Sequence, residues 1–138
     1  MNEQADAAAS LKGIARIEAK ARGRSGWYVG YLWMFAGWQL VLVPAVLLWH
    51  GPVGATVSAL ANAVVVAGLS LFATRQPVVP RGHAGTHLTV VGVWAVAYVL
   101  ALVLGLTAFP DSLAFAAAAA VVCALPAAVA ARREVRAA

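Results

Sequence analysis

The polar side chains that could do chemistry inside the apolar part of this chain are few. Gln39, Asn62 and Tyr98 each lie near the midpoint of a long apolar run. Polar side chains in hydrocarbon must be satisfied internally, so we expect an intramembrane polar cluster at one level, in which at least two of these three contact each other or backbone carbonyls. Interhelical hydrogen bonds average only about 0.6 kcal/mol, which favours a role in setting helix register. A substrate pocket at the same level is the alternative.

Other groups that usually carry chemistry are missing or stand alone. His83 and His87 are spaced i,i+4, but a metal needs further ligands, and His50 belongs to a different link of the chain. The sequence has no serine flanked as a nucleophile elbow and no glycine-rich phosphate loop. A single cysteine, Cys123, excludes an internal disulfide and a cysteine-rich zinc site. We therefore predict no catalytic residue, no metal and no cofactor, and a protein that is not an enzyme.

Four long apolar runs must position these residues. They cover residues 27–49, 53–74, 88–109 and 112–131, and none contains a charged side chain. As helices they would each rise about 30 Å, which matches the hydrocarbon core of a bilayer. Hydrophobic residues make up 63% of the chain and charged ones 11%, which leaves too little polar surface to cover a water-soluble globule. The sequence predicts an all-α integral membrane four-helix bundle with a single transmembrane domain, residues 27–131.

The links between the runs predict how the helices pair. Residues 50–52 separate the first two runs, and residues 110–111 separate the last two. Links this short require two antiparallel transmembrane hairpins. The longer link, Arg75 to His87, contains Pro77, Pro80, Gly82 and Gly85, which argue against helix. We expect a loop there.

The basic residues predict the orientation of the bundle. All 10 Lys and Arg residues lie before the first run, between the second and third, or after the fourth, and the two short links carry none. Because Lys and Arg near helix ends stay on the cytoplasmic side, we predict a multi-pass protein of the cytoplasmic (inner) membrane with both termini cytoplasmic. This orientation explains the excess of positive charge. No recognisable fold or aromatic platform supports binding to nucleic acid.

Two basic segments lie outside the apolar runs: an arm, residues 1–26, and a tail, residues 132–138. In the arm, Leu11, Ile14 and Ile17 recur near the helical period. A row of cations steps by four along another face: Lys12, Arg16, Lys20 and Arg24. This pattern predicts an amphipathic N-terminal interfacial helix whose cations face anionic lipid, at about 1 kcal/mol each. A docking arm for a cytosolic partner is the alternative.

The layout as a whole combines three features. The basic arm ends in Arg24-Ser25-Gly26-Trp27-Tyr28, the four runs are rich in alanine and valine, and Arg132-Arg133 follows the last of them. This layout resembles small uncharacterised four-helix integral membrane proteins of high-GC bacteria, some of them encoded beside winged-helix transcription regulators. The resemblance implies the same membrane layout for this chain.

Two classes of function fit these observations. The first is a non-catalytic membrane interaction protein, an accessory subunit or a homo-oligomer, because alanine-rich faces allow helices to approach closely in lipid. The second is a small permease or flippase-like carrier for a neutral or lipidic substrate, with Gln39, Asn62 and Tyr98 as its binding zone. The runs contain no ionisable acid or base of the kind that coupled transport needs. The expected partners are the lipid bilayer and a second copy or another membrane protein. A water-lined cavity beside Asn62 would favour the carrier.

Overall fold

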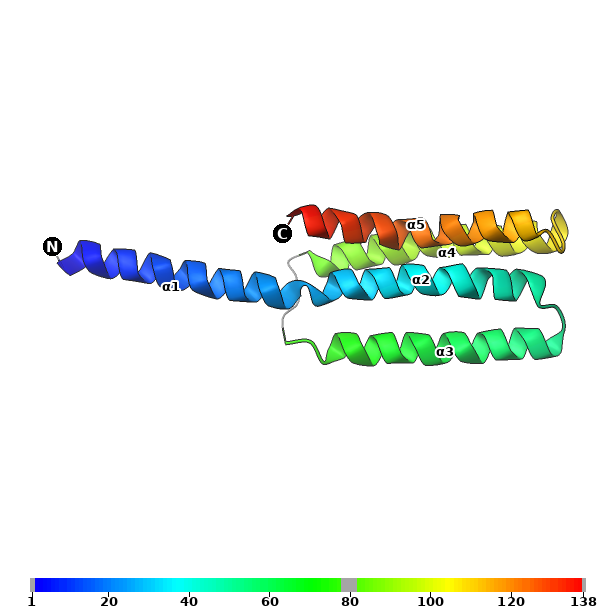
Figure 1. Cartoon of the computed structure of the whole chain (residues 1–138), viewed down its shortest axis with the longest axis horizontal. Coiled ribbons are helices and arrows are strands. Elements are labelled where there is room, and N and C mark those ends of the chain that lie inside the picture. The colour runs from blue at the N-terminus through cyan, green and yellow to red at the C-terminus, as the bar shows by residue number, and fades with distance from the viewer. Residues whose placement is uncertain (1, 78–81, 138) are drawn as a thin grey trace.

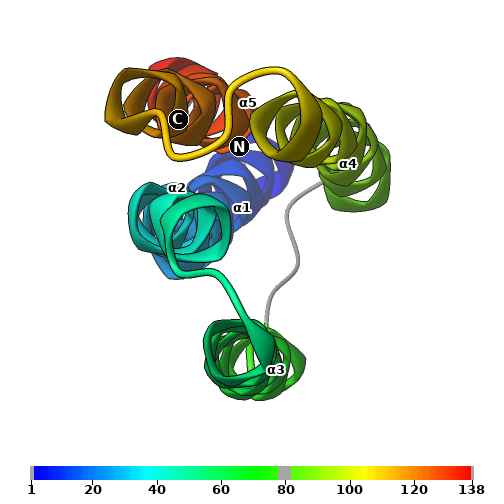
Figure 2. The same ribbon diagram turned by 90° about the vertical axis from the view of Figure 1, so that its right-hand side faces the viewer.

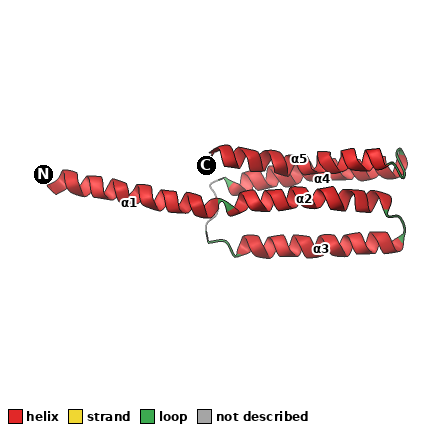
Figure 3. Ribbon diagram, in the orientation of Figure 1, coloured by secondary structure: helices red, strands yellow, loops and turns green. Residues whose placement is uncertain are grey.

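The computed structural model of the chain describes residues 2–77 and 82–137, without the side chains of residues 2, 21–25 and 137. These residues form helices and no strand: α1 (Asn2–Ser25), α2 (Trp27–Leu48), α3 (Pro52–Thr74), α4 (His83–Thr107) and α5 (Leu113–Ala137) (Figures 1 and 3). α2, α3, α4 and α5 are long and apolar enough to cross a membrane. The predicted all-α fold, with four helices that could span a membrane, is confirmed.

Two helices extend beyond the runs predicted from hydropathy. α4 begins at His83, so the predicted loop from Arg75 to His87 is wrong over its last five residues. Gly82 adopts the left-handed conformation (φ 74°) and turns the chain into α4, which carries Gly85 in its first turn. α5 continues to Ala137 through the predicted tail, since arginines are good helix formers and favourable near a helix C-terminus.

The core lies between α2 and α5. α2 contributes large side chains at helical spacing, among them Tyr28, Leu32 and Val43, which are at most 1% exposed. α5 faces them with small residues that are almost completely buried: Ala116, Ala120, Cys123, Ala127 and Ala131. Small side chains on one helix let the two backbones approach, and this contact is the main source of association in lipid. α2 therefore packs more extensively on α5 than on its neighbour in sequence, α3.

α3 lies at the edge of the bundle. Figure 2 shows α2, α4 and α5 grouped together, with α3 attached beside α2. Gly54, Ser58 and Leu69 are the buried residues of α3, and Phe72 contacts Trp27 edge to face at 6.0 Å between ring centroids. Most of the surface of α3 is not covered by the other described helices of the chain.

The two ends of the bundle differ. α2 and α4 begin, and α3 and α5 end, at one end, which we call the termini end; the opposite end is the turn end (Figure 1). At the turn end, Gly51 (φ 96°) precedes Pro52, the first residue of α3, and Asp111 (φ 58°) lies between α4 and α5. His50 Nδ1 lies 3.2 Å from Asp111 Oδ1, so the two turns contact each other.

The arm forms the predicted helix, but its predicted placement along a leaflet is not confirmed. Figure 1 shows α1 extending away from the termini end, nearly in line with α2. A helix lying on a leaflet would run across the bundle axis. The direction of α1 follows from the backbone at Gly26. Because this residue has helical dihedral angles (φ −62°, ψ −14°), the chain passes from α1 to α2 with little change of direction.

Candidate functional site

Gln39 occupies the interior of the bundle at mid-height. It lies on the face of α2 that packs against α5 and is 0% exposed. Neither Oε1 nor Nε2 has a hydrogen-bond partner among the described residues. A buried amide without partners is unusual, because such groups are hydrogen-bonded in most structures. Gln39 is therefore the most conspicuous polar group in the core.

Asn62 does have a partner, but it is a residue that sequence reasoning missed. The indole Nε1 of Trp38 donates a hydrogen bond to Asn62 Oδ1 at 3.1 Å. This bond ties α3 to α2 halfway along both helices. Trp38 and Gln39 are adjacent in sequence and hence about 100° apart around α2. The bond therefore lies on a different face of α2 from the buried Gln39.

Tyr98 belongs to a third environment. Its ring stacks on Trp94 of α4 at 5.3 Å, and both pack against the buried cluster that contains Val43 and Cys123. Trp94 also contacts Phe35 of α2 edge to face at 5.4 Å, while its Nε1 is buried without a partner among the described residues. Among the described residues, Gln39 thus has no hydrogen-bond partner, Asn62 accepts a hydrogen bond from Trp38, and Tyr98 stacks on Trp94.

A cluster of aromatic and histidine side chains at the termini end was not predicted. The ring of His83 packs edge to face on Tyr28 at 4.4 Å and stacks with His87 at 5.5 Å. Tyr28 stacks with Tyr31 at 6.0 Å. Tyr28 Oη and both histidine Nδ1 atoms are buried without a hydrogen-bond partner among the described residues.

The signal for this cluster was present in the sequence. Tyr28 and Tyr31 are spaced i,i+3 on one run, and His83 and His87 are spaced i,i+4 near the start of another. Because a loop was predicted from Arg75 to His87, neither histidine was expected on the face of α4 that meets α2. In the part of the chain that the structure describes, no group of three or more His, Cys, Asp or Glu residues could hold a metal ion.

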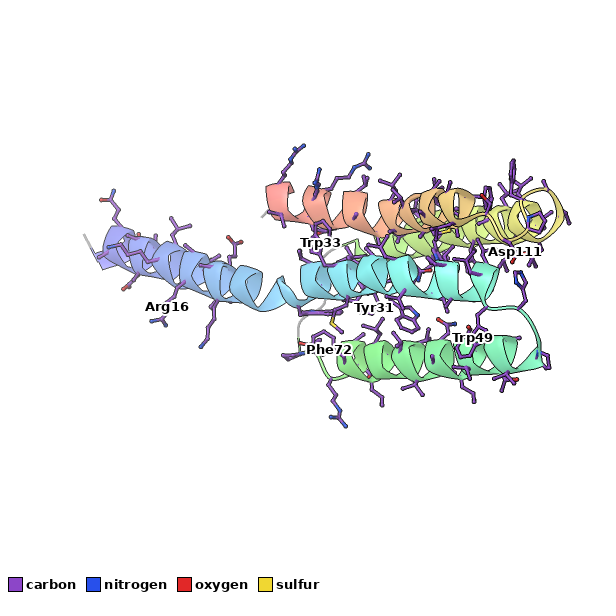
Figure 4. All side chains as sticks on the ribbon, turned by 45° about the vertical axis from the view of Figure 1, so that its right-hand side comes forward. Arg16, Tyr31, Trp33, Trp49, Phe72 and Asp111 are labelled. Carbon is purple, nitrogen blue, oxygen red and sulfur yellow. The ribbon has the colours of Figure 1, made fainter. Side chains whose placement is uncertain are left out.

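The basic arm presents its cations to the surroundings. Lys12, Arg16 and Lys20 are exposed, and Figure 4 shows Arg16 projecting from α1. The side chain of Arg24, the fourth predicted member, lies outside the described residues. Leu11, Ile14 and Ile17 are 68%, 54% and 67% exposed. Both the charged row and the apolar edge are therefore available for contact.

An apolar furrow runs along the outside of the bundle between α4 and α5. Its half nearer the termini end measures about 670 Å³ and extends from Gly85 and Arg133 to Ala97. The half nearer the turn end measures about 600 Å³ and reaches Leu104 and Phe115. The two halves share Val93, Ala97 and Val122. Asn62 lines neither half, so the furrow is separate from the predicted polar level.

Comparison with protein-family models, with curated proteins and with solved structures found no match to this chain.

Proposed function

We propose that this chain is a non-catalytic integral membrane protein that acts through helix contacts, as an accessory subunit or as a homo-oligomer. It would reside in the cytoplasmic membrane as two antiparallel hairpins with both termini in the cytoplasm. Two facts support this orientation. The termini lie at the same end of the bundle (Figure 1), and the turn residues between α2 and α3 and between α4 and α5 contain no Lys or Arg, as the preference of basic residues for the cytoplasmic side requires.

The observation that carries the proposal is the position of α3. Few of its side chains are buried, and its main contact with the bundle is with α2. Its exposed surface includes an i,i+4 ladder of small residues: Ala55, Ala59, Ala63 and Ala67. In α5, buried alanines at similar spacing belong to the most extensive helix contact among the described residues, that between α2 and α5. The α3 ladder offers the same kind of surface to a helix from another chain.

The arm supports the same class of function. In the bilayer, we propose that α1 bends at Gly26, which has no side chain to resist it, and lies on the cytoplasmic leaflet. There the exposed apolar edge would enter the interface and the cations would meet anionic headgroups. A protein that lies partly on the leaflet surface presents α1 to any partner that approaches from the cytoplasm.

The test is purification in a mild detergent, with the oligomeric state and any co-eluting protein identified by native mass spectrometry. We expect a second copy or a defined membrane partner. Replacing Ala59 and Ala63 by leucine should release it without changing the helix content. The matched control is Val64→Leu, since Val64 is 72% exposed and lies off the ladder. A wild-type protein that is monomeric and partner-free in several mild detergents would overturn the proposal.

A small carrier for a neutral or lipidic substrate is the second candidate, and Gln39 is the observation that favours it. A buried carboxamide with both polar atoms unpartnered is a group that a passing substrate could hydrogen-bond. Uptake of candidate neutral solutes and lipid scrambling in proteoliposomes test this function. Transport that disappears in Gln39→Leu would support it, and no transport by a monodisperse wild-type protein would count against it.

A further inference from the structure

We propose that the half of the α4–α5 furrow nearer the termini end binds one anionic phospholipid, with its phosphate beside Arg133 and an acyl chain along the furrow. The inference does not rest on the proposed association, which uses the exposed ladder of α3. It follows from the length, the lining and the charge of this half of the furrow.

The length fits a lipid of one leaflet. From Gly85 to Ala97 the furrow follows α4 for 12 residues, which is about 18 Å at 1.5 Å per residue. Half of a hydrocarbon core of roughly 30 Å is about 15 Å. A volume of about 670 Å³ is within the roughly 300–1,000 Å³ typical of small-molecule sites. An acyl chain that enters at the termini end would therefore occupy this half from end to end.

The lining fits an acyl chain below a polar mouth. Val90, Val93, Leu125 and Val129 form the walls. The hydroxyl groups of Thr86 and Thr89, together with the charged side chains of Arg133 and Glu134, lie at the mouth. The half of the furrow nearer the turn end contains no charged residue. The two halves thus differ in charge, which is the property by which a site recognises a phospholipid headgroup.

The charge at the mouth favours an anion. Arg133 and Glu134 both line the mouth. Arg132 and Arg136, in the same last turns of α5 but outside the lining, make the surroundings of the mouth positive. Basic pockets between transmembrane helices on the cytoplasmic side bind anionic headgroups in this way.

The start of α4 adds to the attraction. Gly82 precedes the helix without any side-chain cap, so the first amide groups of α4 point out of the helix without intrahelical partners. Gly85, in this first turn, lines the furrow. The partial positive charge of a helix N-terminus favours a phosphate there. A headgroup between Gly85 and Arg133 would meet both groups.

The test compares lipids that differ in headgroup alone. The purified protein is mixed with phosphatidylglycerol or phosphatidylcholine of identical acyl chains, and the bound lipid is counted by native mass spectrometry. We expect one phosphatidylglycerol to be retained about fivefold better than phosphatidylcholine, as one charge near the surface predicts. Arg133→Gln should remove this preference, and Glu134→Gln should increase it.

The controls separate a site from diffuse attraction. Arg136 is exposed and does not line the furrow, so Arg136→Gln should reduce the preference much less than Arg133→Gln does. Val93→Trp should fill the furrow and reduce retention of both lipids while the helix content stays unchanged. Three results would each overturn the proposal: equal retention of the two lipids, equal losses in Arg133→Gln and Arg136→Gln, or a dimer that retains no lipid because a second copy covers the furrow.

Discussion

We predict that substitution by leucine has opposite effects on the free energy of unfolding at Gln39 and at Asn62. Gln39→Leu replaces a completely buried amide that lacks hydrogen-bond partners among the described residues by an apolar side chain of similar size. Leaving a buried polar group unsatisfied costs roughly 1–3 kcal/mol in soluble proteins. In a bilayer the separated helix also holds Gln39 in hydrocarbon, so a large part of this cost cancels. We expect Gln39→Leu to raise the free energy of unfolding by up to about 1 kcal/mol.

Asn62→Leu should do the reverse. It removes the 3.1 Å bond from Trp38 and leaves the indole N–H without its acceptor. Interhelical hydrogen bonds in membranes average about 0.6 kcal/mol and reach about 1.7. The free energy of unfolding should therefore fall by about 0.6–1.7 kcal/mol, while insertion is unaffected because leucine inserts favourably.

The assay is reversible unfolding in mixed micelles, followed by circular dichroism. A double-mutant cycle with Trp38→Phe isolates the bond, since phenylalanine keeps an aromatic ring and removes the donor. The coupling energy between positions 38 and 62 should be about 0.6 kcal/mol or more. A loss of more than about 1 kcal/mol in Gln39→Leu would mean that Gln39 forms hydrogen bonds and would refute the reasoning. A coupling energy of zero between positions 38 and 62 would refute the stabilising hydrogen bond from Trp38 to Asn62.

Three further predictions address orientation, the arm and a close backbone contact. In a protein without Cys123, a cysteine at position 50 should react with an external thiol reagent and one at position 81 should not; the reverse pattern would invert the proposed topology. α1 should resist protease in anionic vesicles and lose this protection in neutral vesicles or at high salt, because the electrostatic attraction to lipid is screened beyond about 8 Å. Equal protection in anionic and neutral vesicles would contradict binding to the leaflet. A Cβ at Gly54 would lie 2.1 Å from the Trp49 carbonyl oxygen, while a Cβ at Gly68 would meet nothing within 4 Å. Gly54→Ala should therefore lower the midpoint of thermal unfolding by several degrees, and Gly68→Ala should leave it nearly unchanged. Equal midpoints for the two variants would show that the turn between α2 and α3 adapts without cost.

The spans were predictable because hydrophobicity alone decides them. A run of about 20 residues without a charge has to be helical in lipid, since no other partner exists for its backbone groups. The start of α4 was not predictable by the same rule. Gly82 and Gly85 were both counted as helix breakers, yet Gly82 turns the chain into the helix with φ 74° and Gly85 lies in its first turn. A glycine at a helix start has little effect on the turns that follow.

Helix pairing was harder to predict than helix position. Short turns require neighbours in sequence to be antiparallel, but they do not say which faces become buried. α2 buries its large side chains against the alanines of α5, because small residues allow the closest approach and hence the largest van der Waals contact. The same preference separated Gln39 from Asn62 although both lie at mid-height: the face of α2 that carries Gln39 packs against α5, and Trp38, on a different face, meets α3.

Alanine has opposite surroundings on α3 and α5, although the sequence pattern is alike. On α5 the alanines of the face that meets α2, such as Ala116 and Ala127, pack against large side chains and are almost completely buried. On α3 the ladder that contains Ala59 and Ala63 is exposed, and the contact with α2 uses Gly54, Ser58 and Leu69 instead. A lipid-facing helix gains nothing from side chains this small, because leucine or valine fills the same space with more contact. The α3 ladder therefore makes physical sense as a surface that another helix covers, and this difference between two alanine-rich helices is the main reason to expect association.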